Sequence, residues 1–405
     1  MNLTSLNPEY YLAILFLGVC LITYLILPKI RKITLKLGFF DTPDGRSSHK
    51  DIVPTFGGVS FYIVLVLTLF CFQSFDQESV IISLLTSMSI MFFTGLKDDF
   101  KDVSPRIKSL GQLVSVSILM IHAEFRITSF HGFLGLHELH PIISVAISLF
   151  LIIGLINAYN LIDGIDGNAS IVGIVIATTL GVFFFALGMY FYLAVCVAIV
   201  AMLCSFLRYN FSSTKKIFMG DTGSLLIGLT LGALIMRLCS LEAVSVSLIT
   251  LSSSEILLFL LSVLIIPAFD ISRVIIIRLM KKVPIFSPDR NHIHHVLIDT
   301  GLTHKEASII VGFINILMIS SMYVSLLYFG LFISTFVFLF LILTLTYFFF
   351  IIDKRFQTIK VKVKIRRILY RFTRKFSFKQ TKTLFSKESR LAFNKKLKAI
   401  RILFF

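Results

Sequence analysis

Apolar runs of about twenty residues recur along most of this chain, and they limit its possible folds more than any other feature. A helix needs about 20 apolar residues to cross a bilayer core of about 30 Å. Counting such runs gives eleven predicted spans, and hydrophobic residues make up 56% of the chain. The sequence therefore predicts an all-α, polytopic membrane protein. The predicted spans are 10–28, 55–74, 79–96, 107–123, 141–157, 169–188, 189–207, 220–239, 255–275, 308–329 and 331–352.

Basic residues occupy alternate loops between these spans. The loops after the first, third, seventh and ninth spans are rich in Lys and Arg, whereas the opposite loops hold only Arg126, with Arg237 near a span end. Cytoplasmic loops carry an excess of Lys and Arg. We therefore expect the amino terminus outside and the carboxyl terminus in the cytoplasm. Most acidic residues also lie in or beside the basic loops, so we expect any chemistry on the cytoplasmic face of a plasma (inner) membrane.

The excess positive charge lies in one carboxyl-terminal segment. From Lys354 onward there are 18 Lys and Arg residues and one acid, Glu388. We expect a membrane domain over 1–352 and a basic amphipathic tail over 353–405. Basic segments interleaved with apolar residues bind anionic lipid surfaces. Nucleic acid is the alternative partner for such charge, but no helix-turn-helix or aromatic-platform pattern accompanies it, so no nucleic-acid binding is predicted.

An acidic motif follows the third span. Asp98 and Asp102 are four residues apart, and Asp99 is turned about 100° away on a helix. Carboxylates this close repel one another unless they share a cation such as Mg²⁺, or unless one of them stays protonated and acts as a base. A solvated acidic turn balanced by neighbouring lysines is the alternative.

A second motif follows the fifth span, where amides, acids and glycines alternate from Asn157 to Gly167. Asp163 and Asp166 are three residues apart and would share one helical face. Charges at the end of a membrane helix are costly unless they serve a function. The polar side chains of this motif that could face a ligand are Asn157, Asn160, Asp163 and Asp166. A plain polar loop between spans is the alternative.

Two further cytoplasmic motifs point to bound anions or metal. Asp221 stands at the start of the eighth span, where free backbone N–H groups and the helix dipole favour phosphate; an N-cap role is its structural alternative. After the ninth span, Arg290 precedes a histidine cluster, and Arg278 lies nearby. The histidines are His292, His294 and His295. No H-E-x-x-H pattern supports zinc, and Asp270 could form only a local ion pair with Arg273.

Together these motifs are typical of Mg²⁺-dependent phosphoryl transfer, with Mn²⁺ as the alternative ion. A metal and basic groups neutralise phosphates while an acid handles the nucleophile. The membrane setting suggests that one substrate is a lipid. An ion-coupled transporter is the alternative from another class, but transporters place such groups near the bilayer midplane.

The ordered motifs D-D-x-x-D, N-x-x-N-x-x-D-G-I-D-G, M-G-D-T-G-S and P-D-R-x-H-I-H-H resemble the polyprenyl-phosphate N-acetylhexosamine-1-phosphate transferase family (glycosyltransferase family 4 type) over about residues 40–305. The H-x-H-H form is similar to the branch that transfers GlcNAc-1-phosphate from UDP-GlcNAc to undecaprenyl phosphate. This resemblance implies release of UMP and a lipid-linked sugar that starts a cell-envelope glycan. It leaves open another UDP-N-acetylhexosamine or UDP-MurNAc-pentapeptide as donor, and a homodimer as the assembly.

The resemblance also implies roles for the motif residues. Asp221, with Asp163 as a second candidate, would bind the metal. Asp98, Asp99 and Asp102 would form the catalytic group, with Asp98 the better candidate for the base. The nucleotide-sugar would be bound by Asn157, Asn160, Asp163, Asp166, Arg278, Arg290, His292, His294 and His295. One departure is Asn168, where the family usually has an aliphatic residue; it could cap a helix or alter the donor pocket.

Overall fold

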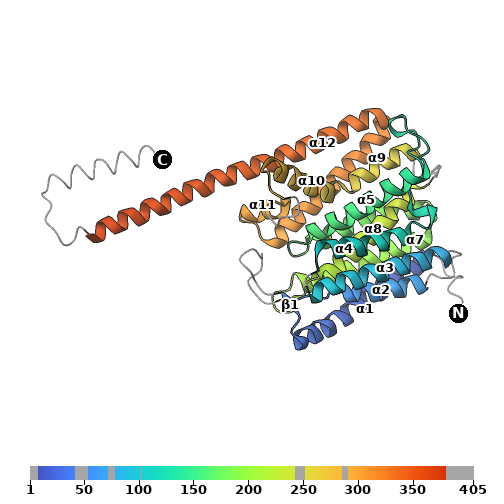
Figure 1. The fold of residues 1–405 in the computed structure, drawn as a ribbon, viewed down its shortest axis with the longest axis horizontal. Coiled ribbons are helices and arrows are strands. Elements are labelled where there is room, and N and C mark those ends of the chain that lie inside the picture. The colour runs from blue at the N-terminus through green and yellow to red at the C-terminus, as the bar shows by residue number, and fades with distance from the viewer. Residues whose placement is uncertain are drawn as a thin grey trace. The chain divides into compact units, whose positions relative to one another are not determined.

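The computed structural model describes residues 8–41, 53–71, 78–101, 103–241, 251–284 and 291–379. In this part of the chain almost every element is a helix, which confirms the predicted all-α class (Figure 1). The helices are α1 (Pro8–Leu37), α2 (Gly58–Cys71), α3 (Glu78–Phe100), α4 (Pro105–Leu119), α5 (Pro141–Ile162), α6 (Asn168–Ala186), α7 (Tyr190–Asn210), α8 (Gly220–Cys239), α9 (Ser253–Val263), α10 (Ile265–Met280), α11 (Ile293–Asp299) and α12 (His304–Lys379). Two short strands, β1 (Phe40–Asp41) and β2 (Val53–Pro54), pair antiparallel.

Within the described residues, seven helices are long and apolar enough to cross a membrane, or eight if the bent pair α9 and α10 is one span. The predicted count of eleven is therefore not confirmed. Two of the predicted spans correspond to α2 and α4, which have 14 and 15 residues and fall short of the roughly 20 that a span requires. The orientation of the termini stays a prediction.

The last two predicted spans both fall within α12. Its apolar part, from His304 to Lys354, is one of the seven candidate membrane helices. Gly330 interrupts it with non-helical angles, φ 67° and ψ −176°. Only glycine adopts this region without a steric penalty. The interruption falls between the predicted spans 308–329 and 331–352. By contrast, the single span predicted over 255–275 is broken at Leu264, where α9 and α10 meet at 62°.

Helix α8 lies at the centre of the membrane body, between α3 and α5 (Figure 1), and also packs against α2 and α6. Of its most apolar 18-residue stretch, 94% is buried, against 17% for α1. A helix that is apolar on all sides and buried this deeply is a core helix. Helix α1, in contrast, presents apolar side chains such as Leu17 and Leu21 outward. The start of α8 is therefore held by the core from several sides.

Backbone pairing fixes the point at which α8 begins. The Phe218 N–H donates to the Pro54 carbonyl, and the Gly57 and Gly58 N–H groups donate to the carbonyls of Phe218 and Met219, each at 2.9 Å. The segment before α2 thus aligns beside the segment before α8. This pairing brings the start of α8 to the ends of α3 and α5, where the predicted motifs lie.

The chain divides into two compact units, Met1–Phe349 and Phe350–Phe405. The predicted boundary lay at residues 352 and 353. The described part of the second unit is the continuation of α12 to Lys379. Its association with anionic lipid stays a prediction.

Candidate active site

The end of α3 caps the start of α8. The Asp99 carboxylate accepts hydrogen bonds from the N–H groups of Asp221 (2.7 Å) and Thr222 (3.0 Å), and from the Thr222 hydroxyl. A helix terminus leaves such N–H groups without intrahelical partners, and a carboxylate there also complements the helix dipole. Asp99 therefore does the capping for which Asp221 was the sequence candidate, and this leaves the Asp221 side chain available to other groups.

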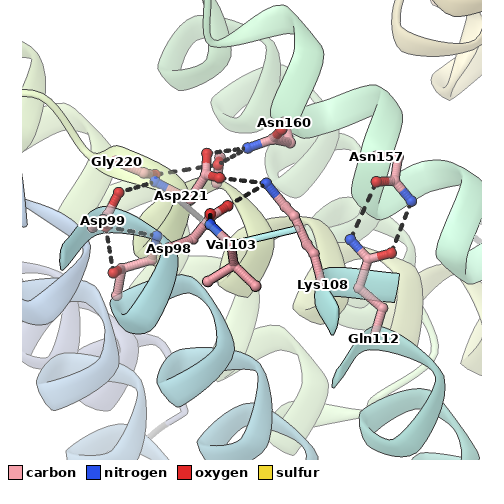
Figure 2. Close-up of polar contacts among 11 residues, drawn as sticks. Asp98, Asp99, Val103, Lys108, Gln112, Asn157, Asn160, Gly220 and Asp221 are labelled. Carbon is pink, nitrogen blue, oxygen red and sulfur yellow. Dashed lines mark hydrogen bonds and ion pairs between the residues drawn. The ribbon is translucent and has the colours of Figure 1, made fainter. Parts of the chain in front are cut away.

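A lysine that the sequence analysis did not assign to the site lies between two of the predicted carboxylates (Figure 2). The Lys108 ammonium group, on α4, ion-pairs with Asp98 at 2.9 Å and with Asp221. The other Asp98 oxygen accepts the Val103 N–H at 2.7 Å, which closes the α3–α4 turn. Lys108 thus offsets the repulsion between Asp98 and Asp221, and its partners bring α3, α4 and α8 to one point.

The two asparagines of α5 have different surroundings. Asn160 donates from Nδ2 to the Asp221 carboxylate and to the Ser224 hydroxyl, both at 2.7 Å, and uses the Asp221 oxygen that Lys108 does not (Figure 2). Asn157 instead exchanges reciprocal bonds with Gln112 of α4, at 3.0 and 3.2 Å, and also donates to the Ile153 carbonyl. Asn160 joins the acidic cluster, whereas Asn157 links two helices at its edge.

The turn between α5 and α6 carries two acids in opposite electrostatic situations. Asp166 pairs with Lys216 at 2.6 Å and with His304 at 3.1 Å. Burial alone would raise the pKa of Asp166, but the bonds from His304 and Lys216 outweigh it and hold that pKa below its usual range. This acid is ionised and charge-balanced at neutral pH.

The Asp163 carboxylate has no hydrogen-bond or ion-pair partner among the described residues, although the backbone N–H of Asp163 donates to the Asn160 carbonyl. Burial raises its pKa well above the usual range, and the charges of Asp221, Asp166 and Asp99 raise it further. A carboxylate that faces other carboxylates without a counter-ion favours the arrival of either a proton or a cation. Among the predicted site acids that the structure describes, Asp163 is the one whose carboxylate has no partner.

Asn168 links the ends of the same turn. Its side chain is buried at the first position of α6, and its Nδ2 donates to the Ile162 carbonyl at the end of α5 (2.7 Å). The adjacent Gly167 N–H donates to Asn210 at 2.6 Å, and Asn210 donates onward to the Ile217 carbonyl. The departure from the aliphatic residue expected at position 168 thus has a structural explanation, since Asn168 satisfies a helix-end carbonyl.

The histidine cluster packs directly on this turn. The His294 ring lies so close to Gly164 that a Cβ added there would come within 2.3 Å of Nε2. His294 is buried, and neither ring nitrogen has a hydrogen-bond partner in the part of the chain that the structure describes. Burial, with smaller contributions from His295 and His292, lowers its pKa well below the usual range, so the ring is neutral. The His294 ring stacks on His292 and contacts His295.

The structure brings some of the predicted site residues together and leaves others apart. The acids Asp98, Asp99, Asp163 and Asp221 gather at the start of α8. Asp166 pairs instead with Lys216 and His304, and Arg278 is a buried residue of α10. Asp102 and Arg290 lie outside the described residues. Lys108, Lys216 and His304 were missed as site residues because, in the sequence, each is only one of many basic or histidine residues near the ends of the predicted spans.

Among the described residues, no three His, Cys, Asp or Glu side chains are arranged to hold a metal ion on their own. Mg²⁺ does not require such a group, because it commonly binds one or two carboxylates and fills its remaining positions with water and substrate phosphate. The unpartnered carboxylate of Asp163, beside Asp221, matches that hard oxygen donor set. The residues present thus fit a Mg²⁺ ion that shares its coordination with a substrate.

The sequence of this chain is similar to those of known proteins. The glycosyl transferase family 4 model matches residues 81–239, from α3 to α8. A Bacillus subtilis (strain 168) protein named probable undecaprenyl-phosphate N-acetylglucosaminyl 1-phosphate transferase is 32% identical over 299 residues, which cover 73% of this chain and 80% of that relative. The chain therefore belongs to glycosyl transferase family 4.

Other members of the family show the same extent of similarity. The undecaprenyl-phosphate alpha-N-acetylglucosaminyl 1-phosphate transferase of Escherichia coli (strain K12) is 27% identical over 77% of this chain and 81% of its own length. The corresponding protein of Salmonella typhi is 29% identical over 73% and 78%. The aligned length corresponds to most of the membrane body. As a family 4 member with several apolar helices, this chain is a multi-pass membrane transferase.

Proposed function

We propose that this protein transfers N-acetylglucosamine 1-phosphate from UDP-GlcNAc to undecaprenyl phosphate and releases UMP. The names of its relatives supply the acceptor and the sugar. The observation that carries the proposal is the unpartnered Asp163 carboxylate beside the Asp221–Lys108–Asp98 contacts. Such a cluster of fixed charges suits a reaction in which two phosphate groups must approach one another.

In the proposed reaction, an oxygen of the lipid phosphate attacks the phosphorus that carries the sugar, and the bond from that phosphorus to the UMP oxygen breaks. Lys108 provides a fixed positive charge beside Asp98, where the lipid phosphate would bind. Asn160 holds Asp221 in one orientation. Asp98, tied to Val103 and Lys108, is the candidate to receive a proton from the lipid phosphate.

Asp163 and Asp221 would hold the proposed Mg²⁺. Bound there, the ion would neutralise the donor diphosphate and polarise its phosphorus–oxygen bonds. Asp166 is already balanced by Lys216 and His304, so it would orient the turn without binding the ion. We place the site on the cytoplasmic face of the plasma membrane, because the residues of the cluster come from the loops that the charge pattern assigns to the cytoplasm.

The test uses purified protein, undecaprenyl phosphate, Mg²⁺ and UDP-GlcNAc labelled in the sugar. We expect lipid-linked labelled product and UMP in equal amounts, and loss of both without Mg²⁺. Parallel reactions with UDP-GalNAc and UDP-MurNAc-pentapeptide separate the remaining donors. Folded wild-type protein that makes no lipid-linked product from any of the three would refute the transferase proposal. Asp221→Asn serves as the inactive control.

A further inference from the structure

Helix α10 carries a buried carboxylate whose two oxygens are both used by one neighbouring segment. Asp270 is 1% exposed. One of its oxygens lies 2.9 Å from His292 Nδ1, and the other accepts the Ile293 N–H at 2.8 Å. The partner expected from the sequence was Arg273, but Arg273 donates to the Asn291 carbonyl instead. Asp270 and Arg273 thus hold the chain on both sides of His292.

The contact with Asp270 determines which nitrogen of His292 carries a proton. An ionised carboxylate can only accept hydrogen bonds, so Nδ1 must be the donor. Nε2 is then the atom available to a ligand, and it has no hydrogen-bond partner among the described residues. In histidines at functional sites, the bond made by one ring nitrogen commonly sets the role of the other in this way.

The His292 ring is also placed against the candidate active site. It stacks on His294 with ring centroids 5.6 Å apart and planes 10° apart. His294 in turn lies against Gly164, between Asp163 and Ile165. A continuous set of contacts therefore runs from Asp270 through His292 and His294 to the acidic turn. His294 cannot bind a phosphate through charge, because burial keeps it neutral; His292 is the member of the pair that has a counter-ion.

We propose that Asp270 is a positioning residue, which acts through His292 to present Nε2–H to a phosphate oxygen of the nucleotide-sugar. The buried carboxylate balances the charge of the protonated ring, and the phosphate accepts from its far side. Charge-assisted bonds of this kind are stronger than neutral ones. This inference rests on the proposed function for the identity of the ligand, but the proton position on His292 does not depend on it.

Asp270→Asn is the discriminating variant. The asparagine oxygen can still accept the Ile293 N–H, while its amide group donates to Nδ1 and transfers the ring proton to Nε2 in the neutral form. This ring still carries Nε2–H but has lost the carboxylate that balances its positive charge, so we expect the KM for the nucleotide-sugar to rise roughly 10- to 100-fold, the effect typical of removing a carboxylate that orients a histidine. The KM for polyprenyl phosphate and the melting temperature should stay near wild type. Glu255→Gln, in the capping box that starts α9, is the matched control and should change neither KM.

A double-mutant cycle with His292→Gln separates positioning from support of the fold. If Asp270 acts through His292, Asp270→Asn adds no further loss to His292→Gln. Additive losses, or equal rises in both KM values together with a lower melting temperature, would overturn the proposal in favour of a purely structural role.

Nuclear magnetic resonance of ¹⁵N-labelled histidine provides a readout independent of activity. In the substrate-free wild type we expect the proton of the neutral His292 ring on Nδ1, and in Asp270→Asn we expect it on Nε2. The opposite assignment in the wild type would refute the inference. An inactive wild-type protein that shows the expected proton position would count against the proposed function alone.

Discussion

Lys108 and Asp221 form an ion pair across 113 positions of sequence, and Lys108 also pairs with Asp98. Its ammonium group therefore joins two acids that belong to separate motifs. Without it, the two carboxylates would repel each other at the start of the central helix. The pair makes Lys108 as much a part of the site as the acids are.

Lys108→Met keeps the aliphatic stem but removes the positive charge. Since fixed charges at a phosphoryl-transfer site are commonly worth about 10²–10³ in kcat, we expect a loss of that size in transfer assays. Lys101→Met, an exposed lysine at the end of α3, is the matched control. Wild-type turnover in Lys108→Met would remove the lysine from the site.

Replacing Asp99 should mainly lower stability, whereas replacing Asp98 should mainly lower turnover. Asp99→Asn places an amide N–H group against the N–H donors of α8, so it should lower the free energy of unfolding by about 1–3 kcal/mol. Asp98→Asn can still accept from Val103, so it should lose turnover with little change in stability. Thermal unfolding in detergent, measured beside activity, checks both. Equal stability of the two variants would contradict the capping role.

Asp163 and Asp166 predict opposite dependences of stability on pH. The raised pKa of Asp163 means that the folded protein keeps a proton which the unfolded chain releases. Its contribution to the free energy of unfolding without Mg²⁺ therefore falls as the pH rises from the ordinary carboxylate range through the raised pKa. The lowered pKa of Asp166 stabilises the fold above the ordinary range, and this stability is lost as the pH falls through the lowered value.

Melting temperatures across pH, with and without Mg²⁺, test this contrast. Asp163→Asn should melt above wild type at alkaline pH without Mg²⁺ and should lose any stabilisation by the ion. Asp166→Asn should melt below wild type at neutral pH. If Mg²⁺ stabilises Asp163→Asn as much as wild type, Asp163 does not bind the ion.

Gly164→Ala should disturb the site through His294, since the new Cβ would overlap its ring. Packing an extra methyl group into a filled interior typically costs about 1–3 kcal/mol. His294→Ala in the same protein opens space for that methyl group, so the double variant should regain part of the stability lost by Gly164→Ala. Independent, additive losses would show that the two residues are not in contact.

Asn168→Leu tests whether the departure from the usual family residue affects the donor. The leucine cannot donate to the Ile162 carbonyl, so we expect a loss of about 1 kcal/mol in stability. The ratio of kcat/KM values for UDP-GlcNAc and UDP-GalNAc should not change, because Asn168 is buried within the turn. A changed ratio would return Asn168 to the donor pocket.

Much of this architecture was readable because bilayer spans follow a simple rule of length and hydropathy. The rule identified the helices, but it does not separate a short helix such as α2 from one long enough to cross a membrane, so the predicted count of eleven is not confirmed by the candidate spans among the described residues. It also treated α9 and α10 as one span, because the apolar run continues through the bend at Leu264.

The site was predictable where chemistry is concentrated in short motifs, and less so where partners come from distant positions. The acids near Asp98, Asp163 and Asp221 stood out as costly charges at membrane helix ends. Their partners Lys108 and Lys216 did not, since a lysine near the end of a predicted span is ordinary. Asp99 as the cap of α8 depends on a contact across 122 positions, which one sequence alone does not reveal.

The same cap has a consequence for how the protein is made. During translation Asp99 leaves the ribosome 122 residues before Asp221, so the finished end of α3 waits at the membrane without its N–H partners until α8 is inserted. A chain that ends before that point lacks the contact that caps the central helix, so the arrangement of acids around Asp221 can form only after α8 is in place.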